Sequence, residues 1–216
     1  MNKSPLTPRS AAFTLIELLV VLGVVAIIAT LLYPRLLKEK KISQRISCTS
    51  NLKQINFAFR IWAGDRTNLN PMQVSMEFGG TKERIATGET FRHFEVMSNE
   101  LNTPLVLTCP SDYARNRERS FSKLGNANMS FFVGIDADDE HPGALLAGDR
   151  NILGGTLVAT NLLDLTNTNG VGWGRDLHNG QGNVAMADGS AQGFSSSALR
   201  TALMNSGLVT NRLAMP

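Results

Sequence analysis

The sequence predicts an α+β protein in which one long N-terminal helix carries a small head built on an antiparallel sheet. Three observations favour this fold class: an almost uncharged run near the N-terminus, an amphipathic stretch after it, and a Gly- and Asn-rich remainder with short apolar runs. With 216 residues, the chain has room for one ordinary domain and an anchor. A content of 43% hydrophobic and 18% charged residues indicates a globular protein rather than a disordered one.

The apolar run covers residues 13–33, where Glu17 is the only charged residue. As a helix with a rise of ~1.5 Å per residue it would span roughly 31 Å, about the thickness of the hydrocarbon core of a bilayer. A secretory signal would have a shorter apolar stretch followed by small residues, whereas Ala11 and Ala12 precede this one. We therefore expect a helix that spans the membrane and stays on the mature protein.

Glu17 is the anomaly of this run, because a carboxylate near the middle of a bilayer costs ~2.5–3.5 kcal/mol on insertion scales. Two interpretations are open. In the first, Glu17 lies close enough to the helix start to reach the lipid headgroups and to favour the helix N-terminus electrostatically. In the second, Glu17 meets a positive partner when subunits pack. A free amine on Phe13, created by cleavage after Ala12, would be suitable.

After Pro34 the pattern becomes amphipathic, with apolar residues recurring at steps of three or four along one face. These residues are Ile42, Ile46, Leu52, Ile55, Phe59 and Trp62. The simplest interpretation is one helix from residue 13 to about residue 63, kinked at Pro34 and stopped by Gly64-Asp65. Its first half would lie in the membrane and its second half would pack against a soluble domain.

Residues 64–216 are expected to form the head, in which a short helix and a closing helix accompany several strands. The helices are predicted at residues 90–101 and 196–207, and the strands within residues 128–136, 143–151 and 155–161. Two further runs flank Asp188-Gly189. This dipeptide favours a two-residue hairpin turn, because both positions tolerate positive φ.

The residues "AFTLIELLVVLGVVAIIATLLYP" resemble the N-terminal signature of type IV pilins and of the pseudopilins of type II secretion. The resemblance implies that a prepilin peptidase removes the leader, residues 1–12, by cutting between Ala12 and Phe13 on the cytoplasmic side. Phe13 is then N-methylated. Glu17 becomes the fifth residue of the mature chain, where the family places its glutamate, and Pro34 falls where many members have a kinking proline. One departure is that Ala12 stands before the cut, where glycine is usual.

The resemblance implies a structural subunit rather than an enzyme, assembled into a type II secretion pseudopilus or a type IV pilus-like filament. Its expected partners are the prepilin peptidase and methyltransferase, other pilin-like subunits, the inner-membrane assembly platform and membrane lipid. The expected location is the bacterial inner membrane, single-pass, with a cytoplasmic N-terminus and a periplasmic head. An alternative from another class is a singly anchored periplasmic protein whose head binds a ligand without polymerising.

The charge pattern conflicts with this orientation, because basic residues after the span outnumber those before it and positive residues favour the cytoplasm. We give precedence to the processing signature, since the peptidase must reach the leader from the cytoplasm.

Three further motifs, "CTSNLKQINFAF", "LTCPSD" and "HNGQGNVAMADG", are similar to a pseudopilin-like group named for a histidine, nine residues and then Asp-Gly. In this chain that motif is His178 followed by Asp188-Gly189. His178 with Asp188 suggests a metal-binding or catalytic pair. The preferred interpretation is structural, with the histidine bonding to backbone or to a carboxylate near the hairpin.

Cys48, in the long helix, and Cys109, in the "TCPSD" loop, are the two cysteines of the chain. Two cysteines far apart exclude a CxxC redox motif and a four-thiolate zinc site. A disulfide between them would pin the head to the helix and would suit an oxidising compartment. The alternative is two unrelated buried thiols.

The segment "DADDEH" places four carboxylates close together in sequence, and oxygen ligands of this kind suit calcium. They belong to Asp136, Asp138, Asp139 and Glu140. Some major pseudopilins bind calcium in the head, but the spacing here does not match an EF-hand loop. A solvated acidic loop is the preferred interpretation, and no cofactor is expected.

Two classes of function have little support in the sequence. The 21 Lys and Arg residues are spread along the chain with no basic stripe interleaved with aromatics, so nucleic acid is not an expected partner. No serine or cysteine nucleophile stands in a recognisable motif, so catalysis is not expected either.

Overall fold

The structure is a computed structural model that describes residues 14–66 and 68–216. The chain divides into two compact units, the first ending at Lys40 and the second comprising Lys41–Pro216. Helix α1 (Leu15–Gly64) contributes its first part to the first unit and its remainder to the second. It ends at Gly64, as the sequence predicts.

The first unit contains the apolar part of α1, in which Leu15–Tyr33 is long and apolar enough to cross a membrane. These 19 residues correspond to roughly 28 Å of helix. The helix is continuous across position 34, and the kink expected from Pro34 stays a prediction.

The second unit combines α1 with short helices and an antiparallel sheet. Its other α-helices are α2 (Phe91–Glu95), α3 (Ser98–Leu101) and α4 (Ser196–Met204). Single 3₁₀ turns are η1 (Met76–Phe78), η2 (Lys82–Arg84), η3 (Pro104–Leu107), η4 (Phe121–Lys123) and η5 (Asn126–Asn128).

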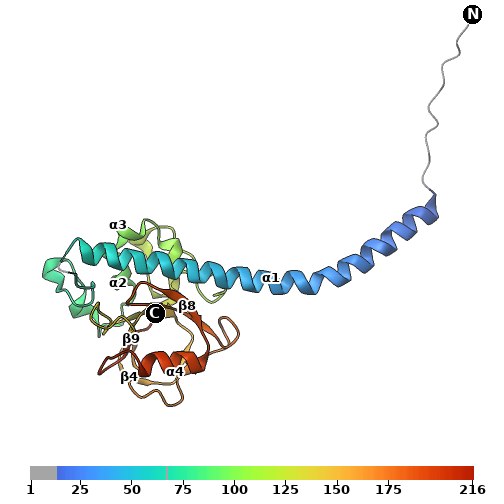
Figure 1. The fold of residues 1–216 in the computed structure, drawn as a ribbon. Helices are drawn as coiled ribbons and strands as arrows, with labels where there is room; N and C mark the ends of the chain where they lie inside the picture. The colour runs from blue at the N-terminus through green and yellow to red at the C-terminus, as the bar shows by residue number, and fades with distance from the viewer. Residues whose placement is uncertain (1–13, 67) are drawn as a thin grey trace, which may run out of the picture. The chain divides into compact units, whose positions relative to one another are not determined.

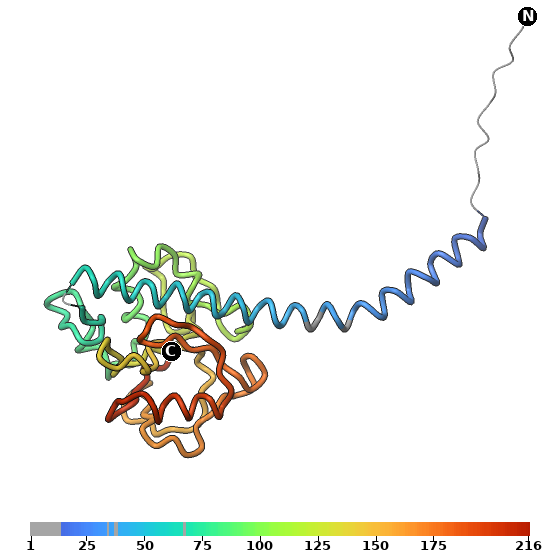
Figure 2. The backbone as a smooth tube through the Cα atoms, in the orientation of Figure 1, coloured from blue at the N-terminus to red at the C-terminus, as the bar shows by residue number. Residues whose placement is uncertain are grey.

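Among the described residues, seven strands form one sheet in the order β4-β5-β9-β1-β2-β7-β8, and every neighbouring pair is antiparallel. These strands are β1 (Phe131–Gly134), β2 (Leu145–Asp149), β4 (Thr156–Ala159), β5 (Leu162–Asp164), β7 (Gly182–Met186), β8 (Ala191–Phe194) and β9 (Arg212–Ala214). A separate pair joins β3 (Ile152–Leu153) to β6 (Gly172–Trp173). The C-terminal strand β9 lies inside the sheet, so the chain ends within the head (Figure 2).

The sheet lies between α1 and α4, with a hydrophobic core on each face (Figure 1). Successive side chains of a strand point to opposite faces, so Phe131 packs into the core with α1 and Phe132 into the core with α4. The first core receives Trp62 from α1, and the second receives Leu199 from α4. The fold is therefore α+β, as predicted, with a second helical layer added.

The pairing of β2 with β7 contains a bulge between Leu145 and Ala147. Leu145 packs into the core with α4, whereas both Leu146 and Ala147 pack into the core with α1. The alternation resumes after the bulge, and Asp149 lies on the α1 face, where it contacts Cys48.

Three local expectations need correction. The apolar stripe on α1 is buried from Cys48 onward, whereas Ile42 and Ile46 are 54% and 65% exposed because the head does not cover that stretch.

The helix predicted at residues 90–101 is two helices, interrupted where Met97 leaves helical geometry and buries its side chain. In the β7–β8 turn, Gly189 has a φ of 95°, whereas Asp188 keeps a negative φ and accepts a hydrogen bond from the Ser190 N–H.

Candidate functional site

Thr14 and Glu17 close a reciprocal capping box at the start of α1. The Glu17 carboxylate accepts a hydrogen bond from the Thr14 backbone N–H at 2.8 Å, and the Thr14 hydroxyl accepts one from the Glu17 N–H at 3.3 Å. The Thr14 hydroxyl also donates to the same carboxylate oxygen at 2.8 Å. This geometry agrees with the first interpretation of Glu17, in which the carboxylate serves the helix N-terminus.

The predicted cleavage and methylation positions, Ala12 and Phe13, lie outside the described residues. The capping box begins directly after them, so the described helix starts within the segment that would follow the cut.

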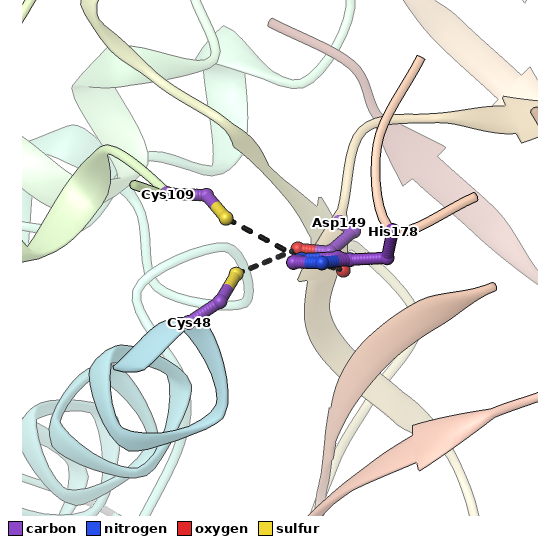
Figure 3. A group of neighbouring side chains, drawn as sticks. All are labelled: Cys48, Cys109, Asp149 and His178. Carbon is purple, nitrogen blue, oxygen red and sulfur yellow. Dashed lines mark hydrogen bonds and ion pairs between the residues drawn. The ribbon is translucent and has the colours of Figure 1, made fainter. Parts of the chain in front are cut away.

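The head contains a cluster of four buried, chemically reactive side chains from four distant segments (Figure 3). Cys48 comes from α1, Cys109 from the loop after η3, Asp149 from the end of β2, and His178 from the loop before β7. One donor atom from each side chain lies within 4.8 Å of the donor atoms of the other three. We call these four residues the Cys-His-Asp cluster.

The contacts in the Cys-His-Asp cluster are short. The Cys48 Sγ lies 3.1 Å from Asp149 Oδ1, and the Cys109 Sγ lies 3.4 Å from His178 Nε2. The same His178 nitrogen is 3.4 Å from Asp149 Oδ2. Both cysteines are free thiols, so the predicted disulfide is not formed in this structure; each sulfur faces another donor instead.

Water is excluded from the cluster. The two cysteines and Asp149 are at most 1% exposed, and the side chain of His178 is 2% exposed. Asn183 fixes the carboxylate, because its backbone N–H and its side-chain amide both donate to Asp149 Oδ2, at 2.7 and 2.9 Å. The amide oxygen of Asn183 in turn accepts a hydrogen bond from Arg45 on α1 at 3.3 Å.

Burial and mutual proximity shift every pKa in the cluster. Burial raises the pKa of Asp149 to about 7, against the opposing charge of His178, and also raises the pKa of the Cys48 thiol. The hydrogen bond from Cys48 lowers the pKa of Cys109 to about 5, with a further contribution from His178. For His178, burial lowers the pKa, but the hydrogen bond with Cys109 and the charge of Asp149 outweigh burial and raise it.

The arrangement differs from a Cys-His-Asp catalytic triad. In such a triad the nucleophile and the carboxylate bind opposite nitrogens of the imidazole ring, so that the carboxylate orients the base. Here Cys109 and Asp149 approach the same nitrogen, Nε2 of His178, and the thiol is closed off from solvent. Donors that converge on one point suit a shared cation better than a proton relay.

The loop that presents His178 has an unusual backbone. His178, Asn179 and Gly180 are three consecutive residues with positive φ, at 46°, 55° and 79°. A left-handed conformation is uncommon for a residue with a Cβ atom, and conformations of this kind collect at functional sites. The imidazole points toward the two sulfur atoms (Figure 3).

The structure separates His178 from Asp188, the two residues that the sequence motif paired. His178 contacts the carboxylate of Asp149 rather than that of Asp188, and its structural role stays a prediction. Asp188 lies in the β7–β8 turn and lines a cavity of about 320 Å³ that Asp139 also lines.

The acidic segment does not gather its carboxylates around one point. Asp136 forms an ion pair with Arg212 and accepts hydrogen bonds from the Arg212 N–H and the Thr210 hydroxyl. Asp138 binds the ring and backbone N–H of His141. Calcium binding by Asp136, Asp138, Asp139 and Glu140, the less favoured interpretation of this segment, stays a prediction.

Asp149 is the cluster residue that sequence reasoning missed. It ends the apolar run of a predicted strand, where a lone carboxylate next to buried positions is a usable signal. The pairing of each sulfur with a donor from another segment had no sequence signal, since these residues are 69 and 101 positions apart.

Taken together, the fold and the apolar segment define an α+β protein with an N-terminal helix able to span a membrane. Residues 7–33 match the family described as the prokaryotic N-terminal methylation motif, so the N-terminal segment carries a type IV pilin-like prepilin signature. Among curated proteins and solved structures, no significant match to the chain was found.

Proposed function

We propose that this protein is a pilin-like structural subunit that a prepilin peptidase processes and that then assembles into a type II secretion pseudopilus or a type IV pilus-like filament. The matched motif supports a processed pilin-like subunit and belongs to a structural family. In this proposal the peptidase cuts between Ala12 and Phe13, Phe13 is methylated, and the head faces the periplasm. The assembly partners are other pilin-like subunits and an inner-membrane platform.

The observation that carries the proposal is the exposed apolar surface of the first part of α1. All fourteen large apolar side chains between Leu15 and Tyr33 are at least 50% exposed. Lipid solvates such a surface while the subunit is stored in the membrane, and neighbouring helices cover it when subunits bundle. Because lipid tails are as apolar as these side chains, burial alone gives little preference for one neighbour or one register.

Glu17 supplies that preference in the proposed filament. One carboxylate oxygen, Oε2, is held by the cap with Thr14, which fixes the carboxylate at the beginning of the helix. Its other oxygen has no hydrogen-bond partner among residues 14–66 and 68–216, so it is open to the amine of Phe13 on an adjacent subunit. In low dielectric a pair of this kind sets the register, whereas a carboxylate left alone is costly.

Three variants separate the capping role of Glu17 from its charge. Glutamine also fits the third helical position of a capping box, so Glu17→Gln keeps the cap and removes the charge. Thr14→Ala removes the hydroxyl of the cap and keeps the charge. Glu17→Ala removes the cap and the charge together.

We expect all three variants to insert into the membrane. Thr14→Ala assembles, whereas Glu17→Gln and Glu17→Ala lose most filaments. Sheared filaments are quantified by electron microscopy and immunoblotting against the membrane-bound pool. Wild-type filament yield from Glu17→Gln would contradict the charge-pair mechanism.

The proposed orientation has its own test. A reporter enzyme that is active only in the periplasm, fused after Pro216, should be active in cells that express the full chain. Activity of a cytoplasm-specific reporter at the same position would overturn the proposed topology and support the orientation that charge alone favours.

A further inference from the structure

We propose that Cys48, Cys109, Asp149 and His178 together bind one zinc ion, in a structural site inside the head. All four residues belong to the second compact unit, so the site is complete within one chain. The proposal is independent of filament assembly.

The chemistry of the donors favours zinc over a hard cation. Two sulfurs, an imidazole nitrogen and a carboxylate oxygen are all ordinary zinc ligands, and thiolates are poor ligands for calcium or magnesium. Each ligand type occurs in tetrahedral sites, which four side chains fill without help from water.

The donors lie close enough together to share one tetrahedral ion, since one donor atom of each side chain lies within 4.8 Å of those of the other three. With zinc ~2.3 Å from sulfur and ~2.0–2.1 Å from nitrogen or oxygen, neighbouring donors in a tetrahedron are roughly 3.4–3.8 Å apart. His178 Nε2 lies 3.4 Å from Cys109 Sγ and 3.4 Å from Asp149 Oδ2, and Cys48 Sγ lies 3.1 Å from the other carboxylate oxygen, Oδ1. Small outward shifts of the sulfur atoms accommodate the ion.

The charge of the cluster also calls for a cation. A fully buried carboxylate beside two thiols is costly unless its charge is paired, and besides the hydrogen bonds from Asn183 it contacts one imidazole, that of His178. A divalent ion with two thiolates, one carboxylate and a neutral imidazole leaves a net charge of −1. The guanidinium of Arg45, a nearby positive group, reaches Asn183, which itself binds Asp149.

Neighbouring residues fix the orientation of the donors, as residues around a metal site usually do for its ligands. Asn183 donates two hydrogen bonds to Asp149 Oδ2 and so fixes the orientation of the carboxylate. The three left-handed residues that begin at His178 fix the direction of the imidazole. With four protein donors and almost no solvent access, the site is of the closed, structural kind.

The ion would join four segments that are far apart in sequence. These are α1, the loop after η3, the end of β2 and the loop before β7. Zinc binding therefore stabilises the docking of α1 on the head, which is the role that the sequence analysis gave to a disulfide. The two arrangements exclude each other, because a disulfide consumes both thiolates.

The test uses the full-length chain, purified in a nonionic detergent without chelators. We expect elemental analysis to find about one zinc per chain, and denatured protein to carry two alkylatable thiols without prior reduction. Replacing zinc with Co²⁺ should give the visible bands of tetrahedral cobalt and a thiolate-to-metal charge-transfer band. A chain that is lighter by two hydrogens and takes up no alkylating reagent is disulfide-bonded, and this result overturns the proposal.

A matched pair of variants tests the assignment of the ligands. His178→Gln should retain at least about tenfold less zinc after dialysis against a weak chelator, since even residues that only orient a ligand change affinity by about 10–100-fold. The control is His93→Gln. His93 is as buried as the side chain of His178 but lies outside the cluster, so this variant should retain zinc fully. Equal zinc contents in the two variants overturn the ligand assignment.

If the ligand variants fail to fold, the wild-type chain still decides the question. Chelation of the native protein should release the zinc, lower the melting temperature and speed the alkylation of both thiols, because the destabilised head opens more often, and added Zn²⁺ should reverse these effects. A reduced, folded chain that takes up neither Zn²⁺ nor Co²⁺ overturns the proposal.

Discussion

Arg150 binds the carboxylate of Asp112 through two parallel hydrogen bonds, from Nε to Oδ2 at 2.7 Å and from Nη2 to Oδ1 at 2.9 Å. The side chain of Asp112 is 1% exposed and that of Arg150 is 17% exposed. Arg150 follows Asp149 in sequence, and Asp112 lies three residues after Cys109. This ion pair therefore connects two segments that carry residues of the Cys-His-Asp cluster.

Removing the charge of Asp112 should destabilise the head. We expect Asp112→Asn to cost about 3 kcal/mol of unfolding free energy, because the guanidinium of Arg150 loses its buried partner and keeps only Asp176, which is half-exposed and 3.4 Å away. Guanidinium-induced unfolding in detergent, followed by tryptophan fluorescence, measures the effect, since Trp62 and Trp173 both lie in the head.

Glu95→Gln is the matched control for Asp112→Asn. Glu95 pairs with Arg92 at 2.5 Å, but both side chains are about one-third exposed, so the control should cost less than about 1 kcal/mol. Equal losses of unfolding free energy in the two variants would show that the buried Asp112–Arg150 pair stabilises the head no more than an exposed pair does.

Two apolar positions on α1 should respond differently to truncation. Leu52 is fully buried, so Leu52→Ala should cost about 2–5 kcal/mol of unfolding free energy. Ile46 belongs to the same sequence stripe but is 65% exposed, so Ile46→Ala should change stability by about 0.5 kcal/mol or less. A large loss of stability at Ile46 would show that the head covers more of α1 than the structure indicates.

His93 should make the head sensitive to acid. Burial lowers the pKa of His93 to about 4, from an ordinary value near 6.5. The unfolded chain therefore binds this proton more readily, and stability that is present above about pH 6.5 is lost as the pH falls toward 4. At about 1.4 kcal/mol per pKa unit, the full loss is roughly 3 kcal/mol.

The variant His93→Gln isolates this effect. Glutamine does not titrate and can keep a hydrogen bond to the Thr81 hydroxyl, which lies 2.7 Å from His93 Nδ1. Unfolding free energies measured between pH 7 and 4 should fall less steeply for the variant than for the wild type. Parallel pH profiles would show that His93 does not contribute to the acid sensitivity.

Crosslinking through α1 distinguishes a filament subunit from a singly anchored protein. Single cysteines introduced at exposed positions between Leu15 and Tyr33 should give regular ladders of crosslinked chains in membranes that contain the assembly machinery. Cys48 and Cys109 are buried and should give no ladder in the parent chain. Monomers alone at every introduced position would favour the singly anchored alternative.

Much of the fold was predictable because it depends on local patterns. The long apolar run, the short apolar runs of β1 and β2, and the closing helix α4 are all visible in short windows of sequence. The exposure of Ile42 and Ile46 was not predictable in this way. An amphipathic stripe shows which face of a helix is apolar, but not how far along that face the rest of the protein extends.

The candidate site was predictable only in part. The sequence singled out Cys48, Cys109 and His178, but it paired the cysteines with each other and His178 with Asp188. The neighbour of each side chain depends on strand order and register, which bring the end of β2 under α1 and beside the loop before β7. Short-range spacing, such as nine residues between a histidine and Asp-Gly, carries no information on contacts of this kind.

The bulge in β2 decides on which side of the sheet the Asp149 carboxylate lies. In a regular strand that starts from Leu145 on the α4 face, residue 149 would also point toward α4. One additional residue before Ala147 exchanges the faces to which the following side chains point, so that Asp149 contacts Cys48 instead. Deleting that single residue would leave the composition of the strand almost unchanged, yet it would move the carboxylate through the sheet and leave two thiols and an imidazole without their fourth member.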